Sequence, residues 1–539
     1  MPNLERLPTA NNRFEDLRRS NQIYVDHTDL LYEIVRFKRP SFLSRPRRFG
    51  KSLLISAIES LFKHGTEYFR GLKIEPAWSS LEKDNRYKVI RLDFSSLIYS
   101  CRQEFDYVLC KRLRDVIKTE EISVREILPE DNAGDILFKI IADNKSQVVL
   151  LIDEYDYPLT HSLGDEALFD DYRKYIQGLF GAIKDLTGDL RFVFISGVGR
   201  FAKTSVFSQL NNLRDLGLES DFSTLLGYTD EDIHQYFNEY VENAADILKI
   251  TTDECYRLIK AHYDGYRFHV NNETTLYNPW SVLNFLSAPK NGFRNFWYET
   301  GGAYPTLIAK YIKSIQDTPL ETLQKVRIIE DDLNLFYDYF DVPTVSLLYQ
   351  TGYLTLTEEY DEKLAITWLN LCPPNFEVKS ALSKLYLLKV REQPLSVEDV
   401  RTAAALSTDF RSQNYENLIK HFNVILNSFG FDNKVAFTDE RNCRDFIDLA
   451  LNVAGIISRK EILSAKGRAD LAVEQDEFRF VFEFKLARDK SSEEKLLIEA
   501  EEQLNDKVYG EIVPFKTTIK IPVVISAQNK AVALWKVIS

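Results

Sequence analysis

Residues 45–52 read R-P-R-R-F-G-K-S and contain the residue types that bind the phosphates of a nucleoside triphosphate. Lys51 supplies a mobile positive charge for the β- and γ-phosphates, and Ser52 supplies a hydroxyl for Mg²⁺. The backbone N–H groups of such a loop, and of a helix that begins after it, bind phosphate oxygens. The usual pattern is G-x-x-x-x-G-K-[ST], and Arg45 stands where its first glycine belongs. The loop alone is therefore equally consistent with a basic turn before an ordinary helix.

Two acids that could complete such a site come later in the chain. Asp153 and Glu154 directly follow the apolar run 148–152, which is typical of a strand buried on both faces. In that position Asp153 can hold Mg²⁺, and Glu154 can act as a general base toward the attacking water. Ser196 lies near the end of another apolar run, where a side chain can sense the γ-phosphate. Two solvated acids after a buried strand are the alternative, but the combination with the Gly-Lys-Ser loop favours an ATP site.

Asp470, Glu483 and Lys485 form a second candidate site near the C-terminus. Residues 466–473 and 478–486 flank a polar turn and predict the two strands of a hairpin. Glu483 and Lys485 are two residues apart, so both project from one face of the second strand. Two carboxylates can hold divalent cations, which activate a water and neutralise charge during phosphodiester hydrolysis, and Lys485 can stabilise the developing charge. A solvated edge hairpin is the alternative.

These candidates require a sheet and helices to position them. Residues 53–62 are apolar at helical spacing, and residues 87–94 add a strand between the two ATP-site motifs. Strands that alternate with helices predict a parallel sheet in an α/β fold. We expect an ATPase core over 1–225, a helical lid over 226–340, a winged-helix-like connector over 341–400 and a nuclease-like domain over 401–539.

Composition narrows the classes of protein. The 539 residues carry a net charge of −13, so a polyanion contact requires a local basic patch, such as the one within residues 36–51. The five cysteines are scattered, which argues against a disulfide framework or a zinc site and for a reducing cytoplasm. No apolar run approaches the roughly 20 residues of a membrane span, and the N-terminus lacks the order of a signal peptide.

Seven short motifs together resemble a known family. They are Y-V-D-H-T at 24–28, the loop at 45–52, L-I-D-E-Y-D at 151–156, I-S-G-V at 195–198, D-G-Y-R-F at 264–268, Y-N-P-W-S at 277–281 and G-Y-L-T at 352–355. This set resembles the bacterial AAA-ATPase-like family, whose members usually carry a C-terminal PD-(D/E)XK nuclease-superfamily module. The resemblance implies a P-loop NTPase with a helical lid and an α/β restriction-endonuclease-like domain. A loop without the first glycine is normal in that family. The family typically has lysine at the position of His27, which leaves a nucleotide role of His27 in doubt.

The C-terminal residues resemble the PD-(D/E)XK superfamily pattern in order. Residues 467–470 (G-R-A-D) and 483–485 (E-F-K) match its two strands, and Glu461 matches an acid often present upstream. In that superfamily a glutamine on the following helix faces the site. Gln503, followed by Tyr509, stands in this place.

The candidate residues divide by role. Nucleotide-binding candidates are Arg47, Arg48, Phe49, Gly50, Lys51, Ser52, Asp153 and Ser196; metal ligands are Ser52, Asp153, Asp470 and Glu483; catalytic candidates are Glu154, Asp470, Glu483, Lys485 and Gln503. We expect Lys51 to face solvent. Arg200 and Lys203 either read phosphate charge or are solvated loop charges, and Arg267 either reaches the nucleotide from the lid or packs in a turn.

Two functions are compatible with these residues. One is an ATPase that uses Mg²⁺ and whose nucleotide state controls a Mg²⁺- or Mn²⁺-dependent nuclease acting on nucleic acid, DNA rather than RNA. Family analogy adds defence against mobile elements as the setting. The other is an ATP-switched signalling or scaffold protein whose nuclease-like domain binds without cutting. The acidic balance favours the second reading, and the complete Asp–Glu–Lys set favours the first. We also expect a cytoplasmic location and no membrane contact. The sequence is compatible with a homo-oligomer.

Overall fold

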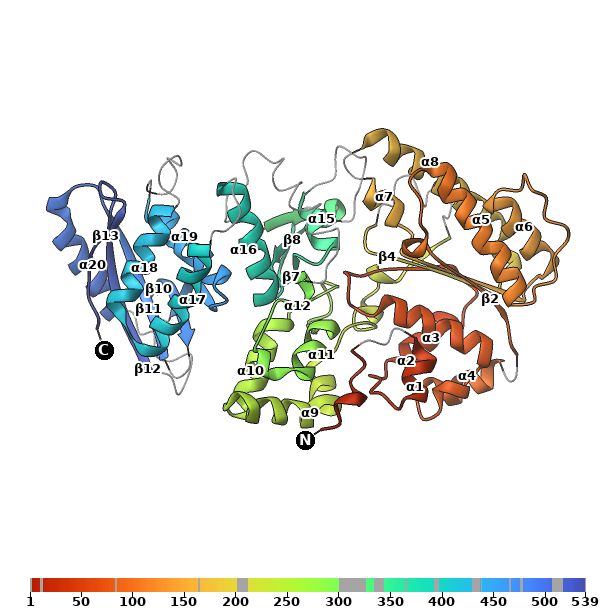
Figure 1. Cartoon of the computed structure of the whole chain (residues 1–539), viewed down its shortest axis with the longest axis horizontal. Coiled ribbons are helices and arrows are strands. Elements are labelled where there is room, and N and C mark those ends of the chain that lie inside the picture. The colour runs from red at the N-terminus through yellow and green to blue at the C-terminus, as the bar shows by residue number, and fades with distance from the viewer. Residues whose placement is uncertain are drawn as a thin grey trace. The chain divides into compact units, whose positions relative to one another are not determined.

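A computed structural model gives the fold of the chain (Figure 1). The structure describes residues 2–9, 13–82, 85–162, 165–200, 212–299, 326–333, 344–363, 366–391, 397–428, 437, 439–464, 467–475, 478–506 and 517–538. Among them, one compact unit comprises the residues up to Glu377 and a second comprises those from Val378 onward. This division falls inside the expected connector 341–400, at the start of α16 (Phe376–Arg391). The four domain ranges stay predictions.

The first unit is built on a parallel sheet in the order β2-β3-β4-β1-β5. Every neighbouring pair in it is parallel, which confirms the predicted parallel α/β sheet. The strands are β1 (Ser41–Ser44), β2 (Lys88–Asp93), β3 (Val148–Asp153), β4 (Phe192–Gly197) and β5 (Arg214–Asp215). This arrangement brings the polar site residues together, because the carboxyl ends of parallel strands meet at one edge of the sheet.

Helices cover both faces of this sheet (Figure 1). Leu150 and Ile152 pack into the core under α5, α6 and α8, whereas Val149 and Leu151 pack into the core on the other face. This alternation on one strand explains its unbroken apolar run. The helices are α1 (Phe14–Arg19), α2 (Thr28–Val35), α3 (Lys51–His64), α4 (Ile74–Glu82), α5 (Arg102–Thr119), α6 (Ala133–Asp143), α7 (Tyr157–His161) and α8 (Glu166–Leu186).

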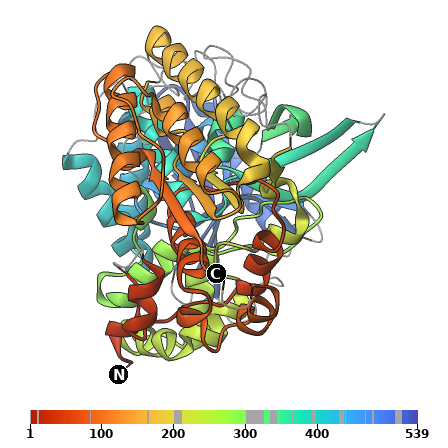
Figure 2. The ribbon, with the colours of Figure 1, turned by 90° about the vertical axis from the view of Figure 1, so that its right-hand side faces the viewer.

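A helical segment and a small antiparallel sheet follow in the same unit. The helices are α9 (Asp230–Leu248), α10 (Thr252–Tyr263), α11 (Pro279–Ser287), α12 (Phe296–Glu299), α14 (Glu330–Leu333) and α15 (Thr344–Gln350). The strands β6 (Val326–Ile329), β7 (Thr355–Lys363) and β8 (Ile366–Cys372) pair in the order β6-β8-β7. Figure 2 shows the β7–β8 hairpin projecting from the neighbouring helices.

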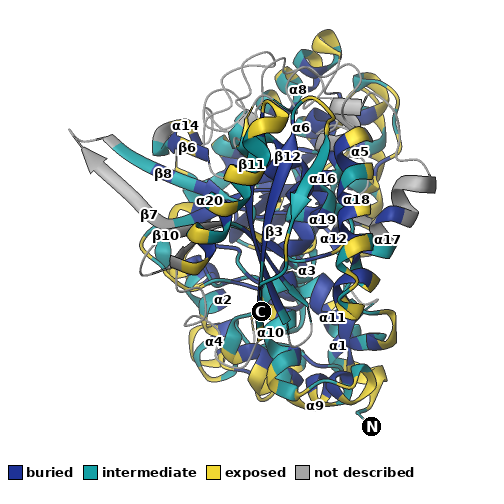
Figure 3. Cartoon of the chain, turned by 90° about the vertical axis from the view of Figure 1, so that its left-hand side faces the viewer, coloured by how far each residue is buried: buried dark blue, intermediate teal, exposed yellow. Residues whose placement is uncertain are grey.

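The second unit holds a mixed sheet in the order β13-β12-β11-β10-β9. Its strands are β9 (Ser458–Ser464), β10 (Gly467–Gln475), β11 (Phe478–Ala487), β12 (Thr517–Ser526) and β13 (Ala531–Trp535), of which only β11 and β12 are parallel neighbours. Its further helices are α17 (Val397–Ser412), α18 (Tyr415–Ser428), α19 (Glu440–Val453) and α20 (Glu493–Asp506). The central strands are largely buried (Figure 3). In the described part of the chain, no helix combines the length and apolarity that crossing a bilayer demands.

Candidate functional sites

The loop at 45–52 connects β1 to α3, as the sequence predicts. Gly50 is the N-cap of α3 and has φ of 93°, a left-handed conformation that glycine adopts without strain. No side chain caps this helix, and its first turn contains no acid. The N–H groups of the first turn and the positive end of the helix dipole are therefore available to an anion.

Lys51 is buried in this structure, so the expectation that it faces solvent is wrong. The side chain is 5% exposed, and Nζ donates to the backbone carbonyls of Arg45 (2.9 Å) and Pro46 (3.1 Å). Burial lowers the pKa of Lys51, an effect that the nearby carboxylates of Glu154 and Asp153 oppose. The ammonium thus lies within the loop and bridges two of its carbonyls. A bound phosphate would replace these carbonyl oxygens as its partner.

Asp153 ends β3, and its carboxylate has three neighbours, the Ser196 hydroxyl, the Glu154 N–H and Arg91. Oδ1 accepts a hydrogen bond from the Ser196 hydroxyl at 2.6 Å. Oδ2 is buried without a hydrogen bond and lies 3.9 Å from Nη2 of Arg91. The structure therefore brings Asp153 and Ser196 together, with Ser196 supporting the acid. Oδ2 is the oxygen that remains for a cation.

Glu154 follows with a backbone φ of 48°, which is uncommon for a residue with a side chain. Burial raises the pKa of Glu154, and the charges of Lys51 and Arg47 oppose that rise. A raised pKa brings a carboxylate closer to the range in which it accepts a proton efficiently at neutral pH. The side chain faces the same cavity as Lys51 and Ser52.

A cavity of about 770 Å³ joins these residues. The loop contributes Arg47, Arg48, Gly50, Lys51 and Ser52 to its lining, and other segments contribute Pro8, Tyr228, Pro279, Trp280 and Leu283. The loop side of the lining is cationic, and the other side is largely apolar. The guanidinium of Arg48 lies 4.2 Å from the centre of the Trp280 ring and connects the two sides. The volume lies within the range of small-molecule sites, roughly 300–1,000 Å³.

Arg45 and Phe49 turn their side chains away from this cavity. Arg45 donates to the carbonyls of Ser44 and Phe222, and its guanidinium lies 4.3 Å from the Phe268 ring centre. Burial lowers the pKa of Arg45 to about 10. Phe49 is 1% exposed and meets Tyr266 edge-on. The arginine that replaces the first glycine therefore holds the loop against the following segments, and only the backbone of Phe49 can face a phosphate.

Arg200 and Arg267 are both buried. Arg200 donates through Nε to the Ser44 hydroxyl at 3.0 Å and lies 3.5 Å from Asp215, so it is no solvated loop charge. Arg267 donates to three backbone carbonyls, of which Thr357 O is one, at 2.7 Å each. This pattern supports the packing reading of Arg267. Lys203 lies outside the described residues.

The C-terminal candidates lie on neighbouring strands of the second unit. Asp470 on β10 accepts a hydrogen bond from the Phe484 N–H of β11 at 2.9 Å. On β11, Lys485 Nζ lies 3.9 Å from Oε1 of Glu483, whose side chain is buried. Phe482 and Phe484 point into the core on the other face. The strand alternation thus places Glu483 and Lys485 together, beside the strand that carries Asp470.

Gln503 lies on α20, the helix that covers this face. Leu504 packs against Ala472 of β10 and Val481 of β11. Ala472 shares a face with Asp470, and Val481 shares one with Glu483, because each pair is two residues apart. The Gln503 Oε1 atom is buried without a hydrogen bond. The side chain of Glu461 on β9 and the whole of Tyr509 lie outside the described residues.

Two residues near this site escaped the sequence analysis. Glu440, at the start of α19, lies 3.6 Å from Lys485 Nζ through Oε2. Arg444, one turn later, lies 4.0 Å from Oδ1 of Asp470 and is bound to Asp445. The N-cap pattern at 439–442 indicates a helix start. Nothing in the sequence, however, places that start beside Lys485.

Family models match a part of each unit. Residues 8–207 match the model of a predicted AAA-ATPase. Residues 438–536 match the PD-(D/E)XK nuclease superfamily. The chain carries an AAA-ATPase-like domain and a PD-(D/E)XK nuclease-superfamily domain. A relative from Azotobacter chroococcum mcd 1, the "Uncharacterized protein in vnfD 5'region", is 29% identical over 515 residues, which cover 94% of this chain and 93% of the relative.

The two domains support an ATPase function together with a nuclease-like function, and the second indicates contact with nucleic acid. The residues fit divalent cations in both. Oδ2 of Asp153, which accepts no hydrogen bond, suits Mg²⁺ in the AAA-ATPase-like domain, and the neighbouring Asp470 and Glu483 suit a cation in the nuclease-superfamily domain. Across the described residues, no three His, Cys, Asp or Glu side chains form a ready-made metal cluster. Waters and phosphate oxygens would complete either site, as is usual for Mg²⁺.

Replacing Lys51 by Ala should remove most nucleotide binding. Its buried ammonium lines the cavity, and charge-assisted contacts to phosphate are among the stronger hydrogen bonds in proteins. The exposed Lys38→Ala variant, which removes the same charge outside the cavity, should bind normally. Calorimetry with an ATP analogue measures both, and thermal unfolding separates lost binding from lost fold. Equal affinity in the wild type and Lys51→Ala would remove the phosphate-loop assignment.

His27 gives the AAA-ATPase-like unit a pH-dependent contact. Its Nε2 lies 3.0 Å from Oδ2 of Asp232 at the start of α9. Burial alone would lower the pKa of His27, but the hydrogen bond and charge of Asp232 raise it overall. The contact therefore stabilises the fold fully below the unfolded pKa of histidine, and this contribution is lost as the pH rises through the higher folded pKa.

Wild-type protein should accordingly lose stability, on the order of 1 kcal/mol, between pH 6 and pH 9 relative to His27→Asn. Burial alone would raise the pKa of Asp232, but the hydrogen bond and charge of His27 lower it overall. Asp232 therefore stays charged throughout this range. Thermal unfolding of both proteins across the range measures the difference. Parallel pH profiles would show that the contact contributes nothing.

Proposed function

We propose that the protein is an ATPase whose nucleotide state controls a metal-dependent nuclease acting on nucleic acid, DNA rather than RNA. One observation supports the proposal: each unit brings together side chains of the types that its reaction would use. In the first, Lys51, Ser52 and Glu154 face one cavity, and Asp153 directly precedes Glu154 at the end of β3. In the second, Asp470, Glu483 and Lys485 lie on adjacent strands.

In the ATPase unit, each residue has a distinct task. The N–H groups at the start of α3 and Lys51 bind the phosphates, and the apolar side of the cavity takes the base. Asp153, held by Ser196, and Ser52 would hold Mg²⁺, which would neutralise charge on the phosphates. Glu154 removes a proton from the attacking water.

In the nuclease unit, Asp470 and Glu483 would hold the cation, which lowers the pKa of a bound water when present. Lys485 would stabilise charge on the attacked phosphate. Gln503 would orient the water or substrate from α20. Glu440 contacts Lys485 and would position it, so we add Glu440 to this site.

A non-cleaving signalling or scaffold protein is the second candidate. Its supporting observation is the position of Arg444, a guanidinium 4.0 Å from Asp470 that competes with a cation for that carboxylate. Incubation of the protein with plasmid DNA, single-stranded DNA and RNA, each with Mg²⁺ or Mn²⁺ and with or without ATP, decides between them. Cleavage of any substrate that is lost in Glu483→Ala supports the nuclease. Binding without cleavage under every condition supports the scaffold.

A further inference from the structure

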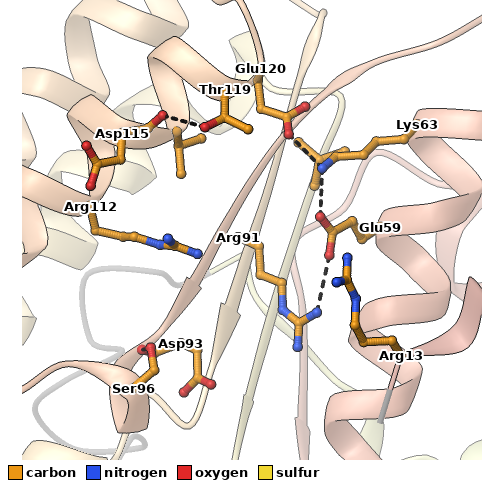
Figure 4. Close-up of a pocket in the computed structure, with 12 residues that line it drawn as sticks. Arg13, Glu59, Lys63, Arg91, Asp93, Ser96, Arg112, Asp115, Thr119 and Glu120 are labelled. Carbon is orange, nitrogen blue, oxygen red and sulfur yellow. Dashed lines mark hydrogen bonds and ion pairs between the residues drawn. The ribbon is translucent and has the colours of Figure 1, made fainter. Parts of the chain in front are cut away.

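A second cavity, of about 500 Å³, opens in the ATPase unit at the edge strand β2 (Figure 4). Its walls come from β2, from α3 and from α5. None of its lining residues lines the nucleotide cavity. The proposed function therefore leaves this cavity without a role.

Three guanidinium groups reach into the cavity from different elements. Arg91 comes from β2, Arg112 from α5, and Arg13 from the residue before α1 (Figure 4). Arg112 forms no hydrogen bond or ion pair within the part of the chain that the structure describes. Asp115 turns its carboxylate away from the centre of this group (Figure 4). Planar guanidinium groups suit phosphate, which they bind through paired N–H donors.

The other acids of the cavity already have partners. Lys63 Nζ donates to Glu59 and to Glu120, at 2.7 Å each. Asp93 Oδ1 accepts hydrogen bonds from the backbone and hydroxyl of Ser95, at 2.9 and 2.7 Å. Glu59 and Glu120 are thus paired with Lys63, and one oxygen of Asp93 is occupied, whereas Arg112 keeps its guanidinium for a ligand.

Arg91 connects this cavity to the ATP site. Its Nη1 donates to Oε2 of Glu59 at 3.2 Å, on the cavity side. Its Nη2 lies 3.9 Å from Oδ2 of Asp153, the oxygen that remains for Mg²⁺. A cation at Asp153 and the Arg91 guanidinium therefore compete for the same carboxylate oxygen.

We propose that this cavity binds a small phosphate-bearing anion, which regulates the ATP site through Arg91. The inference rests on the proposed function, because its effect is exerted on the Mg²⁺ acid of the ATPase. An anion in the cavity gives Arg91 a partner other than Asp153 and frees Oδ2 for the cation. Mg²⁺ at Asp153 in turn repels Arg91 toward the anion, so each ligand strengthens the binding of the other by the same factor.

The test uses full-length protein saturated with Mg²⁺ and a nonhydrolysable ATP analogue, so that the nucleotide cavity is filled. Inorganic phosphate, AMP and adenosine are titrated in separate calorimetry experiments. Phosphate or AMP should bind and adenosine should not. Binding by phosphate itself indicates a free phosphate as the ligand, and binding by AMP alone indicates a nucleotide. Binding of adenosine as tight as that of AMP, or no binding by either phosphate compound, overturns the proposal.

Variants test the residues. Arg112→Ala should weaken AMP binding about tenfold or more, the loss of one charge-assisted contact. Lys111 is exposed on the same helix and does not line the cavity, so Lys111→Ala should not weaken AMP binding. AMP should raise the Mg²⁺ affinity of the analogue complex at least about fivefold. Arg91→Lys should abolish that increase, because one ammonium cannot contact both Glu59 and Asp153.

Undiminished AMP binding in Arg112→Ala, or an Mg²⁺ affinity that AMP leaves unchanged, overturns the regulatory site. Failure of the proposed ATP function is visible separately, because the analogue itself would then not bind. AMP binding to the second cavity can still be measured in that case, and its dependence on Arg112 can be compared in the same way.

Discussion

Replacing Glu154 by Gln should leave ATP bound and slow its hydrolysis by about 100- to 10,000-fold, the usual contribution of a general base. Glu154 faces the cavity that contains Lys51 and Ser52, and burial raises its pKa toward the range of an effective base. Gln preserves size and shape and cannot accept the proton. Asp153 and its contact with Ser196 are untouched, so Mg²⁺ and nucleotide binding should survive. Single-turnover hydrolysis and calorimetry measure the two effects.

The exposed Glu166→Gln variant is the matched control, because it makes the same chemical change outside the cavity. It should hydrolyse ATP at the wild-type rate. Unchanged hydrolysis in Glu154→Gln would mean that another group serves as the base. Loss of ATP binding in the same variant would mean that Glu154 holds the nucleotide rather than the water.

The second large effect is expected at the nuclease site. Asp470→Asn, Glu483→Ala and Lys485→Ala should each reduce metal-dependent cleavage by at least about 100-fold and leave ATP hydrolysis largely intact. Asn at position 470 keeps an oxygen for the Phe484 N–H, so the strand contact persists while the ligand charge is lost. The loss of cleavage then reports on the metal and not on the fold.

Metal affinity separates the roles of these residues. Asp470→Asn and Glu483→Ala should weaken Mn²⁺ binding, whereas Lys485→Ala should not, because an ammonium is no ligand and repels the cation. The side chain of Lys495 is 81% exposed, so Lys495→Ala is the control for the removal of a lysine. If Lys485→Ala lowers thermal stability but leaves cleavage intact, Lys485 serves as an ion-pair partner of Glu483 and Glu440 rather than in catalysis.

The sequence predicts the parts of both sites that follow from local pattern. The apolar run before Asp153 identifies a buried strand, and the two-residue spacing of Glu483 and Lys485 fixes their common face. Glycine before a lysine at a helix start predicts the turn between β1 and α3, because the left-handed conformation of Gly50 is a local requirement.

The parts that escape prediction depend on contacts between distant segments. Lys51 is buried because the loop carbonyls wrap around it, which no pattern of spacing shows. Glu440 meets Lys485 only through the packing of α19 beside β11. Arg91 reaches Asp153 because β2 pairs with β3, and the order of strands in the sheet cannot be derived from the apolar runs alone.

The most direct test of ATP-controlled cleavage compares one nucleic-acid substrate in four states: without nucleotide, with ADP, with ATP and with a nonhydrolysable ATP analogue, all at fixed Mn²⁺. We predict that the cleavage rate differs between these states in wild-type protein. In Lys51→Ala it should stay at the nucleotide-free level, and in Glu483→Ala it should vanish. If wild-type protein cleaves no nucleic acid in any state and binds no divalent ion outside the ATP site, the nuclease account is contradicted and the scaffold account replaces it.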